Sequence, residues 1–214
     1  MSNNSEIRSY GEDAAPKLFE QDDVRTVRGY AIVFNRESQV LYDRQARKYF
    51  VEIIEPVAAT KDYLDSQDIK LNREHDDGRL LARSRYGMGS LRYGVDEYGV
   101  WYETDLPKTS EGKDTYALLM RGDLFGSSFR FAYAEGGYTD EVKGGLIYRK
   151  VKQFAGIYDF SIVADPAYLA TSADARSMDS LLTPQEPEQP EVRERPAYIN
   201  DALNSINSII NNID

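Results

Sequence analysis

Short runs of β-forming residues, each ending in turn residues, recur along most of this chain, and they restrict it to a fold built mainly from β-strands. Residues 24–34 (VRTVRGYAIVF) are rich in Val, Ile and Tyr and end at Asn35, a pattern typical of a strand bounded by a turn. The 16 Tyr and 8 Phe also favour strands and can fill a core. Further strands are predicted at residues 49–54, 68–74, 80–84, 89–95, 99–106, 125–133, 146–154 and 157–163.

Two segments between these strands favour helices. Residues 55–64 suit a short helix opened by Pro56, because proline fits the first helical turn. Residues 110–121 suit a second helix, with Ser110 as its cap and Gly122 as its end. The sequence therefore predicts a mainly β fold with flanking helices (α+β), with an antiparallel meander over residues 80–106.

Composition divides the chain into four parts. Residues 1–23 are polar without a clear period, and we expect a flexible N-terminal arm followed by one globular domain over residues 24–182. Residues 183–196 hold four of the eight prolines and four glutamates, which predicts an extended, solvated linker. In residues 197–213 an apolar residue recurs every three or four positions, which is typical of an amphipathic helix for contact with a partner or within an oligomer. The alternative is a disordered, Asn-rich end.

Charge and motif content exclude several classes of function. A formal net charge of −10 disfavours nucleic-acid binding, so a protein partner is the better expectation. The chain has no cysteine, which excludes disulfides, thiolate nucleophiles and Cys-ligated zinc. No P-loop, dinucleotide fingerprint or paired-His metal motif occurs, so we predict neither a cofactor nor a metal. No apolar run approaches the length of a membrane span or a signal-peptide core, and we expect a soluble, intracellular protein without a membrane partner.

The only histidine, His75, is the first candidate for proton-transfer chemistry. Histidine is the side chain best suited to exchange a proton near neutral pH. A single histidine is more often a structural residue than a catalytic one, and spacing alone favours the structural role for His75. The neighbouring Asp76 and Asp77 fit a solvated turn better than a metal site.

Five sequence blocks stand out when they are taken in order: residues 29–35 (GYAIVFN), 52–56 (EIIEP), 72–76 (NREHD), 122–131 (GDLFGSSFRF) and 159–167 (DFSIVADPA). Together they resemble the prohead maturation protease family of tailed bacteriophages. The resemblance covers roughly residues 24–173. This family is similar to the herpesvirus assemblin proteases, which implies an assemblin-like antiparallel β-barrel core and a serine nucleophile paired with histidine.

The resemblance also implies particular site residues. The family's histidine matches His75, and its serine, in a Gly-x-Ser-Phe-x-Phe strand, matches Ser128 rather than Ser127. The third member, often Glu in a Glu-x-Ser-x-Val pattern, falls on Asp159, whose shorter side chain must approach the imidazole more closely. Alternation places Arg130 on the same strand face as Ser128, as a contributor to oxyanion stabilisation or as an outward arginine that balances acidic surface.

The function implied is that of a serine endopeptidase that cleaves scaffold or capsid assembly proteins, and itself, during virus head maturation. Its expected partners are a scaffold protein or the scaffolding segment of the major capsid protein, and a second copy of itself in a homodimer or higher homo-oligomer. Its expected location is the assembling procapsid in the host cytoplasm. The Pro/Glu-rich linker suits self-cleavage, because proteases need extended, accessible chain. The alternative is a non-catalytic scaffold or capsid-assembly protein on the same fold.

Overall fold

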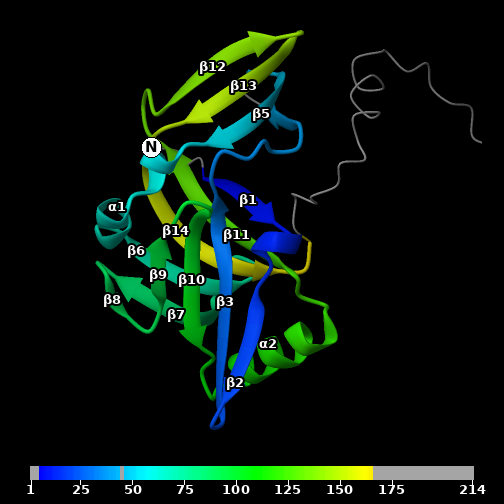
Figure 1. Ribbon diagram of the computed structural model, residues 1–214, viewed down its shortest axis with the longest axis vertical. Helices are drawn as coiled ribbons and strands as arrows, with labels where there is room; N and C mark the ends of the chain where they lie inside the picture. The colour runs from blue at the N-terminus through cyan, green and yellow to red at the C-terminus, as the bar shows by residue number, and fades with distance from the viewer. Residues whose placement is uncertain (1–4, 44–45, 166–214) are drawn as a thin grey trace, which may run out of the picture. The chain divides into compact units, whose positions relative to one another are not determined.

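The computed structural model describes residues 5–43 and 46–165, whose strands form three sheets (Figure 1). The largest has the order β1 (Glu6–Tyr10), β11 (Gly126–Tyr133), β14 (Phe154–Val163), β6 (Asp68–Arg73), β7 (Asp76–Arg85) and β8 (Met88–Gly89). The second has the order β2 (Lys17–Gln21), β3 (Val24–Val33), β10 (Gly99–Asp105) and β9 (Arg92–Val95). The third has the order β12 (Tyr138–Lys143), β13 (Leu146–Val151), β5 (Lys48–Ile54) and β4 (Leu41–Asp43).

The mainly β prediction is confirmed, but the expected antiparallel barrel is not what the described residues show. Their three sheets are open, each with two edge strands. In addition, β14 pairs in parallel with β6, and β13 pairs in parallel with β5. Parallel pairs join strands that are distant in sequence and need long crossovers. Turn signals between neighbouring runs predict hairpins only, so these pairings were not predictable from them.

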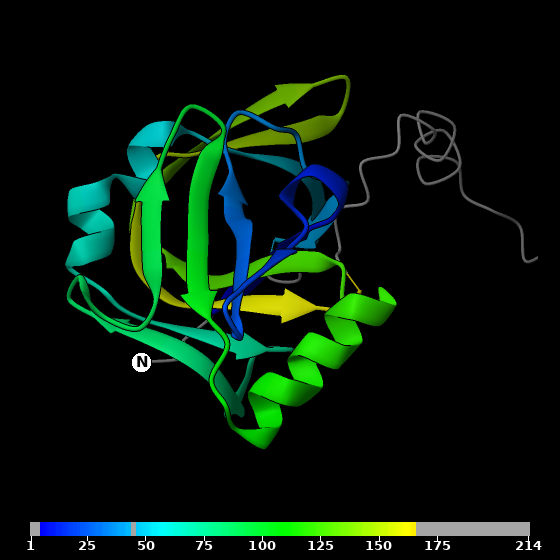
Figure 2. The same cartoon turned by 60° about the horizontal axis from the view of Figure 1, so that its bottom comes forward.

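Helical segments lie between the strands, and Figure 2 shows the longest, α2 (Ser110–Arg121), beside the strand layers. The bounds of α2 match the prediction, although Thr109 rather than Ser110 caps it by accepting a hydrogen bond from Gly112 N. Gly122 ends it in the left-handed conformation, with φ 79°. The helix expected over residues 55–64 is divided into a 3₁₀ turn, η2 (Pro56–Ala59), and α1 (Lys61–Asp65). None of the described helices is long and apolar enough to span a membrane.

The N-terminal segment is folded from residue 5, which corrects the expectation of a flexible arm over residues 1–23. Strand β1 pairs with β11, and β2 pairs with β3; between them lies a 3₁₀ turn, η1 (Glu12–Ala14). Tyr10 and Ala14 are buried in the core. Local polarity does not reveal the pairing of β1 with β11, because β11 lies more than a hundred residues away in the sequence. The predicted domain end at residue 182, the linker (183–196) and the terminal helix (197–213) lie outside the described residues.

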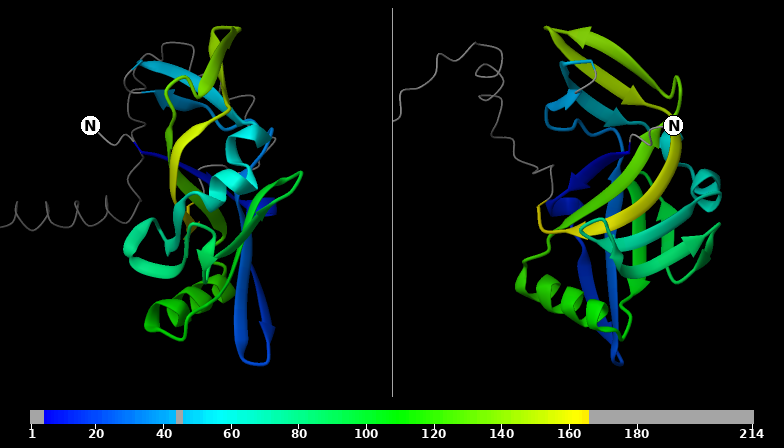
Figure 3. Two further views of the ribbon diagram at one scale, coloured as in Figure 1. Left: turned by 90° about the vertical axis from the view of Figure 1, so that its left-hand side faces the viewer. Right: turned by 180° about the vertical axis from the view of Figure 1, so that it is seen from behind.

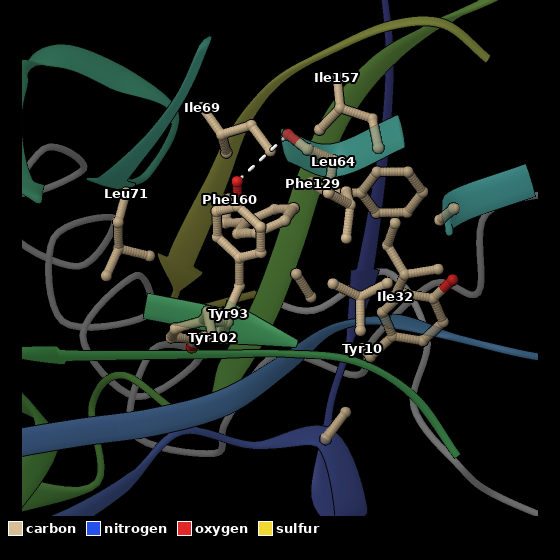
Figure 4. Close-up of a cluster of buried hydrophobic side chains, with 14 of the residues drawn as sticks. Tyr10, Ile32, Leu64, Ile69, Leu71, Tyr93, Tyr102, Phe129, Ile157 and Phe160 are labelled. Atoms are coloured by element: carbon tan, nitrogen blue, oxygen red, sulfur yellow. Dashed lines mark hydrogen bonds between the residues drawn. The ribbon is translucent and has the colours of Figure 1, made fainter. Parts of the chain in front are cut away.

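Aromatic residues from several strands form the core, part of which Figure 4 shows. The alternation predicted for residues 125–133 holds, since Phe129 and Phe131 are fully buried with ring centroids 4.8 Å apart. Phe160 of β14 packs edge-on against Tyr93 and tilted against Tyr102. The core therefore holds one face of β11 and β14 against the second sheet, while their other face remains for polar side chains.

We predict that Phe160→Ala lowers the free energy of unfolding by about 3–5 kcal/mol, because it leaves a cavity among these rings. Urea denaturation followed by tryptophan and tyrosine fluorescence measures the change. Met120→Ala is the control, since Met120 is 63% exposed on α2 and its loss should cost no more than about 0.5 kcal/mol. Equal costs for the two variants would contradict this description of the core.

Candidate active site

The pairing of three strands brings the predicted residues together. Ser128 lies on β11 and Asp159 on β14, and His75 lies in the turn that joins β6 to β7. Across the β11–β14 pair, Ser128 is opposite Ser161, and Arg130 is opposite Asp159. Because side chains alternate along a strand, all four point away from the aromatic core. The parallel pairing of β14 with β6 then places the turn containing His75 over this polar face.

His75 is within hydrogen-bond distance of both other residues. Its Nδ1 lies 2.5 Å from Asp159 Oδ1, and its Nε2 lies 2.7 Å from Ser128 Oγ. Ser128 and Asp159 are fully buried, whereas 12% of the His75 side chain is exposed. This is the arrangement of a serine, a base and an orienting carboxylate. It joins the three residues that the resemblance implies, whose catalytic roles stay a prediction.

A left-handed backbone conformation at Glu74 and His75 positions the imidazole ring. Glu74 and His75 have φ of 56° and 54°, which is unfavourable for residues with a Cβ. Hydrogen bonds to β14 hold them there: Glu74 N donates to Ile162 O (3.0 Å), and His75 N donates to Ser161 Oγ (2.8 Å). Ser161 in turn donates to Asn72 O (3.1 Å). The backbone of the base is thus attached to the strand that carries Asp159.

Ser161 is a positioning residue that residue-by-residue reasoning missed. It is fully buried, and its hydroxyl links β14 to both Asn72 and His75. The signal was present in the family's Glu-x-Ser-x-Val pattern, in which Ser161 stands at the serine position. Only the carboxylate of that pattern was assigned a role.

Arg130 lies against the buried carboxylate. Its Nη2 is 2.6 Å from Asp159 Oδ2, and it also lies 3.7 Å from Asp77 Oδ1. The contact with Asp159 is an ion pair without hydrogen-bond geometry, since Asp159 Oδ2 has no hydrogen-bond partner among the described residues. The structure therefore places Arg130 where its charge offsets the cost of burying Asp159.

The acidic residues after His75 are exposed, as predicted, but they begin strand β7 and do not form the turn itself, which lies at residues 74–75. Asp76 accepts a hydrogen bond from Gly78 N, and Asp77 accepts one from Lys70 Nζ at 2.8 Å. That bond holds the pKa of Asp77 below its usual range. Within residues 5–43 and 46–165, no three His, Asp or Glu side chains gather as metal ligands would.

Comparison with known proteins relates this chain to one family. The family model described as caudovirus prohead serine protease matches residues 13–184. A solved structure of the bacteriophage T4 capsid assembly protease, gp21, aligns with a TM-score of 0.42 and 15% sequence identity, covering 76% of this chain and 98% of that one. No curated protein sequence matches this chain.

We predict that neutral His75 carries its proton on Nδ1, because Asp159 can only accept a hydrogen bond there. As the only histidine, His75 gives an unambiguous side-chain ¹⁵N spectrum, recorded in mildly alkaline buffer. Asp159→Asn should shift the proton towards Nε2, since an amide can donate to Nδ1. Asp77→Asn is the control and should leave the tautomer unchanged. A wild-type ring protonated on Nε2 would contradict the geometry described here.

Proposed function

The chain belongs to the caudovirus prohead serine protease family, and from this membership we propose that it is a serine endopeptidase of virus head maturation in which Ser128 is the nucleophile. The observation that carries the proposal is the continuous contact from Ser128 Oγ through His75 to Asp159. A serine hydroxyl attacks a peptide only when a base removes its proton. His75 is the base within reach.

The proposed mechanism uses the two nitrogens of His75 for different tasks. Nε2 accepts the Ser128 proton as Oγ attacks the scissile carbonyl, and it returns this proton to the leaving amine. Nδ1–H stays bonded to Asp159, which holds the ring in the correct tautomer and stabilises the imidazolium. A water molecule, activated by the same base, then releases the acyl group from Ser128.

Asp159 serves as the carboxylate despite being shorter than Glu. Three contacts compensate for its length: the parallel β14–β6 pairing, and the attachment of Glu74 and His75 to β14. Together they support a direct approach of 2.5 Å between the ring and the carboxylate. Arg130, expected either to contribute to oxyanion stabilisation or to balance acidic surface, contacts Asp159, and we assign it the role of holding this carboxylate in place.

The proposed substrates are the scaffold protein or the scaffolding segment of the major capsid protein, and the chain itself. Action on a prohead places the enzyme inside the assembling procapsid in the host cytoplasm. A homodimer or higher homo-oligomer is proposed as the active form, so activity should be measured at several protein concentrations. The Pro/Glu-rich residues 183–196 are the proposed self-cleavage region.

We predict that Ser128→Ala and His75→Ala each lower turnover of the cognate scaffold by about 10⁶-fold, because these two residues act as one unit. Asp159→Asn should lower this turnover by about 10⁴-fold, because the His75 ring would then carry its proton on Nε2 and could not accept the Ser128 proton there. Scaffold cleavage followed by gel electrophoresis and mass spectrometry measures these changes.

Ser127→Ala is the matched control for this experiment. Ser127 is adjacent to Ser128, but it lies on the opposite face and bonds to Ala14 O and the Tyr102 hydroxyl. It should keep near wild-type turnover. Undiminished cleavage by Ser128→Ala would remove the proposed nucleophile, and a wild-type protein that assembles without cleaving scaffold would support the non-catalytic alternative.

A further inference from the structure

Three paired strands place the buried Asp159 between two cations. Arg130 of β11 is opposite Asp159 of β14, and Asp159 is opposite Lys70 of β6. Figure 3 shows these strands from two further sides, with β14 between its neighbours β11 and β6. Residues that pair across strands lie on the same face of a sheet. The carboxylate of Asp159 therefore has one positively charged residue on each side of it.

A second carboxylate, that of Asp77, engages both cations. Asp77 lies at the start of β7, and its Oδ1 is 2.8 Å from Lys70 Nζ and 3.7 Å from Arg130 Nη2. Arg130 Nη2 is in turn 2.6 Å from Asp159 Oδ2. Lys70, which the register places beside Asp159, thus binds Asp77, and Arg130 is shared between two carboxylates. We refer to Lys70, Asp77, Arg130 and Asp159 as the charge series.

The charge series leads from solvent into the proposed active site. The exposed fraction of the side chain is 58% at Asp77, 26% at Arg130 and zero at Asp159. Electrostatic interactions strengthen where water is excluded, so the inner contacts of the series carry the effect of a charge at its outer end. The hydrogen bond from Lys70, aided by the charge of Arg130, lowers the pKa of Asp77, which keeps this residue ionised at neutral pH.

The charge series ends at the imidazole ring, since Asp159 Oδ1 contacts His75 Nδ1. Charged side chains lie near the His75 turn on β6, β7 and α2 as well as on the turn itself. These groups have their own contacts: Arg73 with Glu111 of α2 (2.7 Å), Arg79 with Asp76 (3.2 Å), and Glu74 with the backbone N of Ala164 (2.7 Å).

The sign of each charge determines its effect on the base. Negative charge nearby stabilises a protonated imidazole, and positive charge destabilises it. Asp77 attracts two cations that would otherwise neutralise Asp159. More of the Asp159 charge is then available to stabilise protonated His75, so Asp77 strengthens the base and Lys70 weakens it.

We propose that Asp77 and Lys70 are positioning residues of the active site, which act through Arg130 and Asp159 to set the strength of His75 as a base. The proposal rests on the proposed function, because base strength matters there for removing the Ser128 proton. It gives a role to two surface residues that the mechanism does not use.

The first experiment follows the protonation of His75 by ¹⁵N NMR during a pH titration of the full chain, and it needs no substrate. Asp77→Asn should move the midpoint of protonation down by about half a pH unit, because it removes a negative charge and keeps the shape of the side chain. Lys70→Met should move the midpoint up by a similar amount. The tautomer of the neutral ring should stay unchanged in both variants, because Asp159 is still present.

Shifts of opposite sign are the decisive result. Both side chains reach solvent, so both variants should fold. Loss of a merely structural support would loosen the contact between Asp159 and His75 in both variants and move both midpoints down. That outcome, or no shift in either variant, would overturn the proposal.

Arg130→Met tests whether the effect passes through Arg130. Loss of this cation beside the buried Asp159 should raise the midpoint by at least about one pH unit. In this background Asp77→Asn should have less than about half of its effect alone, because the connecting residue is missing. An undiminished effect would overturn the role of Arg130. Should Arg130→Met not fold, Arg130→Gln takes its place.

Arg79→Met is the matched control for Lys70→Met. Arg79 is also an exposed cation that binds an aspartate of β7, but this aspartate is Asp76, which lies outside the charge series. The midpoint should change by less than about 0.2 pH unit, because exposed charges act weakly through water and salt. A shift equal to that of Lys70→Met would show a general effect of surface charge and overturn the proposal.

The second experiment measures scaffold cleavage by the same variants as a function of pH. The acid limb of the turnover profile should move in the same direction as the NMR midpoint, with KM unchanged. Cleavage whose acid limb stays in place in both variants would overturn the proposal while the protease function stands. Midpoints that shift as expected, without cleavage by any form, would support the effect of the charge series on His75 and refute the protease function separately.

Discussion

The pairing of β14 with β11 on one side and with β6 on the other is the constraint on which the rest of this structure depends. It places Phe129 and Phe160 on one face, in the core, and Ser128 and Asp159 on the other. The parallel contact with β6 then brings the turn of His75 above them. A slip of one residue in either register would exchange the two faces, so that the packing of the aromatic core and the geometry of the site are determined together.

Two carboxylates are buried among the described residues, and each has an arginine beside it. Asp159 lies between His75 and Arg130, and Glu52 lies between Arg8 and Tyr133. Removing a charge from water is expensive, so a buried carboxylate keeps its place only with such partners. For Asp159 the partners lie on β11 and in the turn between β6 and β7. For Glu52 the cation comes from the edge strand β1.

Local patterns in the sequence predicted most strands and the helix over residues 110–121, because alternation, capping and turn residues act over short distances. They failed where a contact between distant segments decides the outcome. Residues 6–10 are too polar to read as a core strand, yet they pair with β11. Arg130 is a second example. Alternation placed it on the same strand face as Ser128, but its ion pair with Asp159 depends on the pairing of β11 with β14.

The sequence by itself determined the β character of the chain and the identity of the single histidine. Through its resemblance to a family, it also indicated the three expected site residues, His75, Ser128 and Asp159. These are properties of residue type and order. The tertiary structure decided the parallel pairings, the clamping of His75 by Ser161, and the covering of Ser128 by β1. Each of these depends on which strand edges meet, and that is a property of the packed core as a whole, because no local stretch of sequence contains both partners.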